Sequence, residues 1–241
     1  MKVLLTGASG MVGGEVLRQC LAHPSISSIV AFGRRELSLP DETPKAQKLQ
    51  SVVIKDFSKW PEDVLHAHSD AVGMIWCMGS YNGSQTADFE YPLAFQESMV
   101  RVLETKPSRA PFKYIHLSGK FVRQNQEEQL WFMDGPRKLK GLLETKSLSL
   151  AESHPAVWKA FILRPGGIVA KTLTGGGGFN AFTKMGAILG ENWSVRIEEL
   201  AAFMAGVAVD GEGEDSLIEN ARIVRRGREL LELHKTATGS S

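Results

Sequence analysis

The chain has 241 residues, which is enough for one large α/β domain with a well-covered core. Its hydrophobic fraction of 43% and charged fraction of 23% are those of an ordinary globular protein. A net charge of +1 gives no long-range attraction toward nucleic acid or an anionic membrane. Two cysteines make no disulfide framework, and the sequence holds neither a signal-like leader nor a run of about eighteen apolar residues, so we expect a soluble cytoplasmic protein.

The N-terminal segment combines a short strand, a glycine turn and a helix. Val3–Leu5 is an apolar run, and from Met11 onward apolar residues recur at helical spacing. Between them, Gly7, Gly10 and Gly13 suit a tight bend, close backbone approach to a ligand, and close packing of helix on strand. The free N–H groups of such a helix favour a phosphate or pyrophosphate. The spacing is G-x-x-G-x-x-G instead of G-x-G-x-x-G, and a turn that merely needs glycine is the alternative.

Apolar runs and helical periodicity alternate along the rest of the chain. Strands are predicted at 28–34, 51–54, 71–78, 112–117 and 157–163, and helices at 88–106 and 134–152, the second with Asp134 as its N-cap. This alternation predicts an α/β fold, a doubly wound parallel Rossmann sheet with helices on both faces. We expect one NAD(P)-binding domain over residues 1–234, in which 170–234 form a small substrate-side cap, and a flexible tail at 235–241.

Ligands of parallel sheets bind at the carboxyl ends of the strands, so the residues there are candidate site residues. A NAD enzyme usually has an acidic residue about twenty positions beyond the glycines, where it accepts from the ribose 2′-hydroxyl. Here that position holds Arg34, twenty-one residues after Gly13, followed by Arg35. A guanidinium cannot accept a hydrogen bond but matches a phosphate well, which favours NADP(H) over NAD(H). The alternative is that both arginines are merely solvated.

Several segments resemble the atypical short-chain dehydrogenases/reductases, in particular the NmrA-like and Tat-interacting-protein-like branch. They are Thr6-Gly7-x-x-Gly10-x-x-Gly13, Gly33-Arg34-Arg35, Asp56-Phe57, Ser118, Arg164-Pro165-Gly166, 195–201 and 218–220. The resemblance implies a Rossmann fold with NADP(H) across the strand ends. It implies the following contacts: pyrophosphate with Gly7, Ser9, Gly10, Met11, Val12 and Gly13; 2′-phosphate with Arg34 and Arg35; adenine with Asp56 and Phe57; its ribose with Met78 and Gly79; and nicotinamide with the backbone of Pro165, Gly166 and Ile168.

The catalytic part departs from the family pattern. The family uses a strand-end Ser, a helical Tyr and a Lys four residues later that binds the nicotinamide ribose and lowers the Tyr pKa. Ser118 and Lys140 match the Ser and the Lys, but Pro136 stands where the Tyr is expected. Tyr81, after the strand at 71–78, is our candidate surrogate acid, with a lid or packing residue as the alternative. His116 shares a strand face with Ser118 and either lines the pocket or is a hydrogen-bonded core residue.

Two classes of function follow from these residues. The first is an NADP(H)-dependent oxidoreductase that acts on a small, largely apolar carbonyl or alcohol substrate. The second is a non-catalytic NADP(H)-binding regulatory or scaffold protein. We expect a small-molecule partner, no nucleic acid, no membrane and no metal, and a homodimer is compatible with the sequence. Apolar residues in the segments that build the substrate pocket of this fold are Met133, Phe179, Phe182, Met185 and Trp193, and the glycine run 175–178 is either a lid hinge or a linker.

Overall fold

A computed structural model describes residues 1–39, 42–80, 82–106, 110–170 and 190–238. Seven strands form one sheet, in which every neighbouring pair is parallel. The strands are β1 (Lys2–Thr6), β2 (Ser28–Gly33), β3 (Leu49–Val53), β4 (Gly73–Trp76), β5 (Phe112–Leu117), β6 (Trp158–Arg164) and β9 (Leu217–Glu219). Their order is β3-β2-β1-β4-β5-β6-β9, which confirms the predicted doubly wound sheet and puts its switch point between β1 and β4. Beyond β6, β7 (Gly167–Val169) and β8 (Ser194–Arg196) form a small parallel pair.

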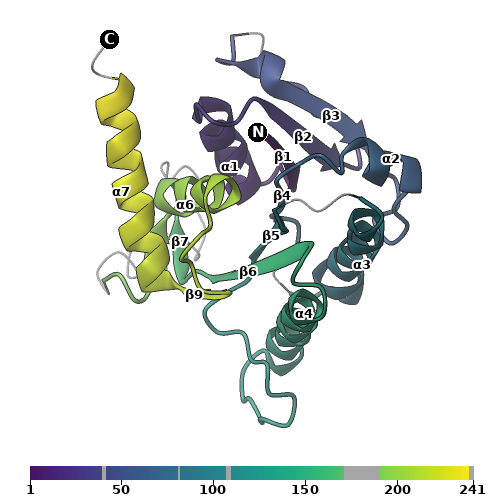
Figure 1. The fold of residues 1–241 in the computed structure, drawn as a ribbon. Helices are drawn as coiled ribbons and strands as arrows, with labels where there is room; N and C mark the ends of the chain where they lie inside the picture. The colour runs from purple at the N-terminus through teal and green to yellow at the C-terminus, as the bar shows by residue number, and fades with distance from the viewer. Residues whose placement is uncertain (40–41, 81, 107–109, 171–189, 239–241) are drawn as a thin grey trace.

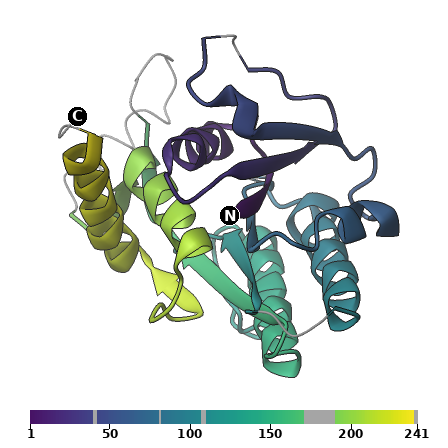
Figure 2. The ribbon, with the colours of Figure 1, turned by 45° about the horizontal axis from the view of Figure 1, so that its top comes forward.

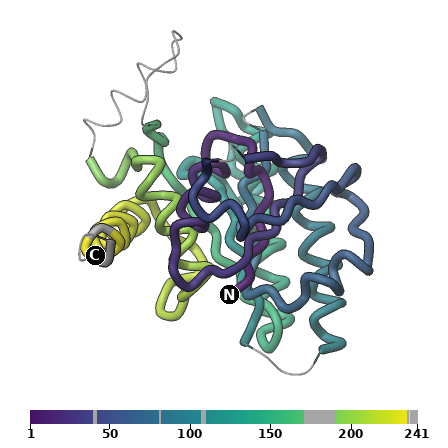
Figure 3. Tube along the Cα trace, turned by 90° about the horizontal axis from the view of Figure 1, so that it is seen from above, coloured from purple at the N-terminus to yellow at the C-terminus, as the bar shows by residue number. Residues whose placement is uncertain are grey.

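Helices cover both faces of the sheet. They are α1 (Met11–Ala22), α2 (Glu62–Ala67), α3 (Tyr91–Glu104), α4 (Asp134–Ser153), α6 (Ile197–Val209) and α7 (Asn220–Thr238), with a 3₁₀ turn at Ala46–Lys48 and a π-helical turn at Thr86–Glu90. One face carries α1 and α6, and the other carries α2, α3 and α4 (Figure 1). The last helix, α7, packs against α6 and lies at the edge of the molecule (Figures 2 and 3). None of the described helices is long and apolar enough to cross a membrane.

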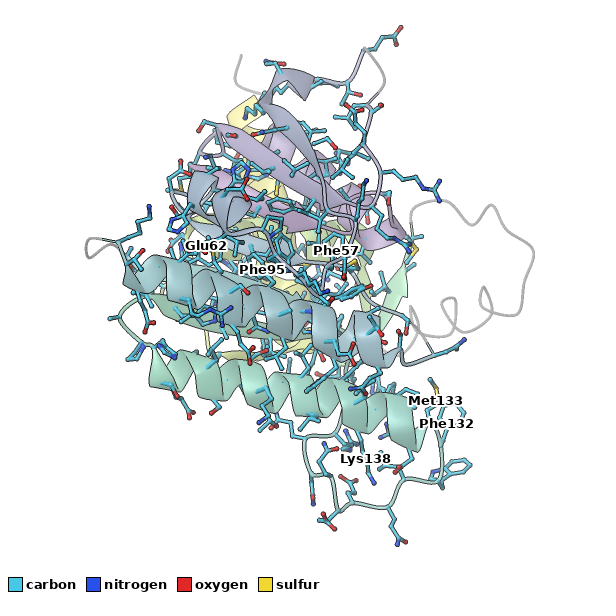
Figure 4. All side chains as sticks on the ribbon, turned by 90° about the vertical axis from the view of Figure 1, so that its right-hand side faces the viewer. Phe57, Glu62, Phe95, Phe132, Met133 and Lys138 are labelled. Atoms are coloured by element: carbon cyan, nitrogen blue, oxygen red, sulfur yellow. The ribbon has the colours of Figure 1, made fainter. Side chains whose placement is uncertain are left out.

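Alternating side chains of the central strands feed two cores. Val3 and Leu5 of β1 pack on the face of α1 and α6, while Leu4 packs on the opposite face. The second core is rich in aromatic rings, among them Phe57 and Phe95, which lie between the sheet and α3 in Figure 4. Strands buried on both faces are typical of a parallel sheet. Because helices cover both faces, we expect a ligand to bind at the loops that follow the carboxyl ends of the strands.

Most predicted elements are confirmed, with shifts of one to three residues at their ends. Asp134 as the N-cap of α4 is wrong, because Met133 holds that position with a left-handed φ of 49° and Asp134 is already helical. The Asp134 carboxylate instead accepts from the Leu130 amide at 3.1 Å and pairs with Lys138 at 3.0 Å. Figure 4 shows Met133 at the start of α4 beside the exposed Phe132. At the other end of the chain, α7 continues to Thr238, past the expected start of the tail at 235.

Candidate functional site

Two of the three glycines in the β1–α1 turn, Gly7 and Gly13, are required by close backbone contacts. Gly7 has a φ of +73°, and a Cβ there would lie 2.8 Å from the carbonyl group of Cys77 just beyond β4. A Cβ on Gly13 would lie 2.0 Å from the Gly7 carbonyl oxygen, and the Gly10 amide donates to that same oxygen at 2.9 Å. Such short contacts exclude any side chain at Gly7 and Gly13 without movement of the backbone. The turn therefore brings the start of α1 to the switch point of the sheet.

The N-terminus of α1 is open to an anion. Gly10 is its N-cap, no side chain caps it, and its first turn has no acidic residue. The first N–H groups of a helix have no partner within the helix, and they attract negative charge together with the helix dipole. Of the predicted pyrophosphate residues, Met11 has a side chain that is 57% exposed and Val12 has one that is buried in the core. These two residues would therefore hold a pyrophosphate through their main-chain amides.

Arg34 and Arg35 directly follow β2, which neighbours β1 in the sheet. Thr6 is level with Phe32, so the two arginines begin at the same edge as the glycine turn. Both side chains are exposed, and neither makes a hydrogen bond or an ion pair with another residue in the described part of the chain. Two cations beside an open helix N-terminus fit a ligand that carries several phosphate groups.

The strand ends after β3 and β4 are more closed than we expected. The Phe57 ring is only 1% exposed and packs edge-to-face against Trp60, so this ring is not open to adenine. Asp56 is exposed, and hydrogen bonds from the hydroxyl and the amide of Ser58 lower the pKa of its carboxyl group. The main chain of Asp56 and Phe57 is what a base could contact. After β4, the Met78 carbonyl accepts from the Trp76 indole at 2.9 Å, while Gly79 is exposed.

Ser118 at the end of β5 points toward helix α4. Its hydroxyl donates to Glu144, a carboxylate with no exposed surface that also accepts from Gln124 at 3.0 Å. Arg164, at the end of β6, donates two hydrogen bonds to the same carboxylate, one from its Nε atom at 3.1 Å and one from a terminal nitrogen. A serine has one proton to donate, and here that proton is committed to Glu144. Glu144 and Arg164 thus join the ends of two strands to α4, and the residue pattern alone did not reveal Glu144.

Lys140 is also engaged, one helical turn before Glu144. Its ammonium donates to the Ser80 carbonyl oxygen at 2.9 Å and lies 3.6 Å from the carboxylate of Asp88. Asp88 is buried and accepts from the Ser80 amide and from the Ser84 amide, both at 2.7 Å. Lys140 and Asp88 therefore hold the loop that follows β4 against α4.

Pro136, the position at which the resemblance led us to look for a tyrosine, packs against this same loop. A Cβ added to Gly83, whose φ is +80°, would lie 2.9 Å from Pro136 atoms. The space over position 136 is thus filled by loop backbone. Tyr81 belongs to this loop but lies outside the described residues, as do 171–189 with Phe179, Phe182, Met185 and the glycine run.

His116 lies inside the molecule and does not line an open pocket. It is 4% exposed, and its Nδ1 atom is 3.2 Å from the Tyr114 hydroxyl. Burial, with a smaller effect from the charge of Lys140, lowers the pKa of His116 to about 3, while Asp88 opposes the shift. It is therefore a neutral core residue at physiological pH.

This burial predicts a pH effect on stability. The unfolded chain binds a proton at His116 near the ordinary pKa of 6.5 and the folded chain does not, so the free energy of unfolding should fall as the pH drops from 6.5 toward 3. The contribution is about 1.4 kcal/mol per pH unit. Urea unfolding of His116→Gln between pH 6.5 and 4.5 should show a flatter dependence than the parent, with His66→Gln on the surface as the control. Parallel curves for the parent and His116→Gln would contradict this.

The loop after β6 is fixed by one buried side chain. Asn220, with no exposed surface, accepts from the Gly166 amide at 2.7 Å and donates to the carbonyl oxygens of Glu191 and Ser194. The Gly167 amide donates to the Trp193 carbonyl oxygen at 2.8 Å. These two amides are thus already bonded within the chain, and Ile168 lies in β7, level with Val195 of β8.

In the ranges that the structure describes, no three metal-ligating side chains of His, Cys, Asp or Glu gather. A cavity of about 140 Å³ lies under Ala71, Phe112 and Val157, at the amino-terminal end of the strands. That is the edge opposite the glycine turn.

Solved structures share this architecture. The reductase domain of PhqB from Penicillium fellutanum superposes with a TM-score of 0.65 at 15% identity, covering 100% of this chain and 78% of that one. An oxidoreductase of the short-chain dehydrogenase/reductase family from Burkholderia thailandensis gives 0.61 at 15% identity, covering 98% and 96%. This chain thus has the same α/β fold as these two proteins. The NADPH-dependent 3-quinuclidinone reductase of Rhodotorula rubra also has it, with a TM-score of 0.61 at 14% identity, covering 92% and 90%.

Sequence comparison gives only short matches. No protein-family model matches the chain. The mitochondrial protein fmp52 of Emericella nidulans is 36% identical over 62 residues, which are 26% of each chain. An N-acetyl-gamma-glutamyl-phosphate reductase of Caldicellulosiruptor saccharolyticus is 36% identical over 59 residues, 24% of this chain and 17% of that one. The matched segments thus span about a quarter or less of the length of these curated relatives.

Proposed function

We propose that this protein is an NADP(H)-dependent oxidoreductase of the short-chain dehydrogenase/reductase type that acts on a small, largely apolar carbonyl or alcohol compound. The observation that carries the proposal is the glycine turn after β1, at the switch point of the sheet, together with Arg34 and Arg35 after the neighbouring strand β2. An NADPH-dependent 3-quinuclidinone reductase has the same fold, which supports the cofactor class but does not decide between NADP(H) and NAD(H).

The residues present fit such a cofactor. The absence of side chains at Gly7 and Gly13 lets the turn pack closely on itself and on the residue after β4. The uncapped N-terminus of α1 follows this turn, and its amides would hold a pyrophosphate. Arg34 and Arg35 would hold the 2′-phosphate through charge-assisted hydrogen bonds. When bound, the nicotinamide supplies or accepts a hydride. The chain's own part is to hold the dinucleotide across the strand ends and to leave the substrate beside its nicotinamide end.

Proton transfer to or from the substrate would need a group other than Ser118, Lys140 or the residue at position 136. The Ser118 proton is bonded to Glu144, the Lys140 ammonium is bonded to Ser80 and Asp88, and position 136 is a proline. Tyr81 remains our proposed surrogate acid. The same engaged contacts favour the second candidate, a non-catalytic NADP(H)-binding regulatory or scaffold protein. The two candidates share the cofactor site and differ only in turnover.

The 2′-phosphate assignment makes a direct prediction. Replacing Arg34 by alanine should weaken NADPH binding by about tenfold to a hundredfold, since a hydrogen bond to a charged group contributes about 1.5–3 kcal/mol, and should leave NADH binding nearly unchanged. Titration of nicotinamide fluorescence measures both dissociation constants, and Arg101→Ala on the outer surface of α3 is the control. An equal loss for NADPH and NADH would overturn the NADP(H) assignment. NADPH consumption with a panel of carbonyl compounds then separates the oxidoreductase from the scaffold, because tight binding without any turnover supports the latter.

A further inference from the structure

Two exposed aromatic residues, Phe121 and Trp193, lie next to the segment predicted to meet the nicotinamide. The Lys120 amide donates to the Pro165 carbonyl oxygen at 2.9 Å, and the Gly167 amide donates to the Trp193 carbonyl oxygen at 2.8 Å. The loop after β5 and the loop before β8 are thus both anchored to residues 165–167. Phe121, the neighbour of Lys120, therefore lies at the same place as Trp193.

The two rings face solvent and not the core. Phe121 is 54% exposed and Trp193 is 46% exposed, and their ring centres are 6.3 Å apart with an interplanar angle of 38°. Most large apolar side chains of this chain are buried in the two cores described above. A pair of tilted, exposed rings at the substrate end of the sheet offers a surface against which a flat apolar ligand can lie.

A lysine ammonium lies beside the Phe121 and Trp193 rings. The Lys120 ammonium lies over the Trp193 ring, 5.3 Å from its centre. Lys120 is half-buried, and no carboxylate of the described residues pairs with it. Two other half-buried lysines differ from it in this respect, since Lys2 pairs with Asp70 and Lys140 with Asp88. The charge of Lys120 is therefore left for a ligand to neutralise.

We propose that Lys120, Phe121 and Trp193 form a binding site for an aromatic carboxylate, and that the substrate is an aromatic carbonyl or alcohol compound that bears such an acid group. The rings would hold the aromatic part by stacking, and the ammonium would pair with the carboxylate. This assignment rests on the proposed function, because it places the substrate beside the predicted nicotinamide end. It refines the largely apolar substrate by adding one fixed negative charge.

The probe for this site is 2-naphthoate, with 2-naphthalenemethanol as its neutral counterpart. Binding of each to the protein in saturating NADPH is measured by isothermal titration calorimetry. Lys120→Met should weaken 2-naphthoate about three- to tenfold and leave 2-naphthalenemethanol unchanged, since only the acid uses the charge. Trp193→Ala should weaken both. Lys159→Met is the matched control, because the Lys159 ammonium also lies over a ring, 4.8 Å from the centre of Phe161. Lys159 lies near the amino-terminal end of β6, whereas the proposed site lies beyond its carboxyl end.

Several outcomes would overturn the assignment. If Lys120→Met and Lys159→Met weaken 2-naphthoate binding equally, the effect is a general one of net charge. If Lys120→Met weakens 2-naphthoate and 2-naphthalenemethanol equally, the ammonium does not recognise the carboxylate. Titration of NADPH in the same samples separates this proposal from the proposed function. If NADPH binds and the naphthoate pattern is absent, only the substrate class fails. If NADPH does not bind and the pattern holds without it, the aromatic acid site stands and the oxidoreductase assignment fails.

Discussion

Replacing Glu144 by alanine should lower the free energy of unfolding by about 3–5 kcal/mol, the usual cost when one partner of a buried ion pair is removed. Glu144 has no exposed surface, and the Arg164 side chain is only 14% exposed, so the guanidinium would lose its main partner where water has little access. The remaining carboxylate near Arg164 is Glu219, at 3.6 Å and 53% exposed, which replaces little of that contact. Ser118 and Gln124 would lose an acceptor as well.

Urea unfolding followed by circular dichroism measures this effect. The control is Glu229→Ala, which breaks a surface pair with Arg226 and should cost less than about 1 kcal/mol. Glu144→Gln keeps an acceptor for Ser118 and removes the charge, so its loss should fall between the two. A destabilisation of Glu144→Ala no greater than that of Glu229→Ala would mean that the network does not hold the strand ends together.

Replacing Gly13 by alanine should destabilise the fold by about 1–3 kcal/mol through overpacking and weaken NADPH binding at least tenfold. The new Cβ would lie 2.0 Å from the Gly7 carbonyl oxygen and 2.5 Å from its carbon. Both atoms belong to backbone that cannot rotate away, so the start of α1 must move from the turn. The amides that would hold the pyrophosphate move with it.

The adjacent glycine provides a matched control. A Cβ on Gly14 would lie 3.4 Å from the nearest heavy atom, an ordinary contact, and Gly14 lies within α1. Gly14→Ala should therefore raise the free energy of unfolding by up to about 1 kcal/mol through helix propensity, with NADPH binding retained. Thermal unfolding and cofactor titration of both variants test the pair. Similar behaviour of the two alanines would show that the turn has more room than the structure gives it.

The periodicity of the sequence predicted the sheet well. The long apolar runs and their helical alternation indicated the strands, and 112–117 coincides with β5. The glycine turn was also predictable, since glycines directly after an apolar run and before a helical pattern indicate a tight strand-to-helix turn. Short elements such as α2, β7 and β8 were missed because three to six residues carry too little periodicity.

The direction of individual side chains was harder to predict. Phe57 follows a strand, but its ring turns into the aromatic core, and the strand position alone does not show this. Ser118 was placed correctly at a strand end, yet its partner Glu144 lies 26 residues further along the chain on α4. Such pairings depend on how helix and sheet meet, which a single sequence does not reveal. The assignments of Arg34 and Arg35 to the 2′-phosphate stay predictions.

The contact between Gly83 and Pro136 closes position 136 to a large side chain. The Gly83 backbone lies close to the proline ring, and a single methyl group added at Gly83 would lie 2.9 Å from it. A phenol at position 136 would need the space that this loop occupies, and the loop is itself tied down through Asp88 and Lys140. Placing a tyrosine at position 136 therefore requires at least two coordinated changes, one on the helix and one in the loop. Pro136→Tyr alone is not expected to install a proton donor at this position.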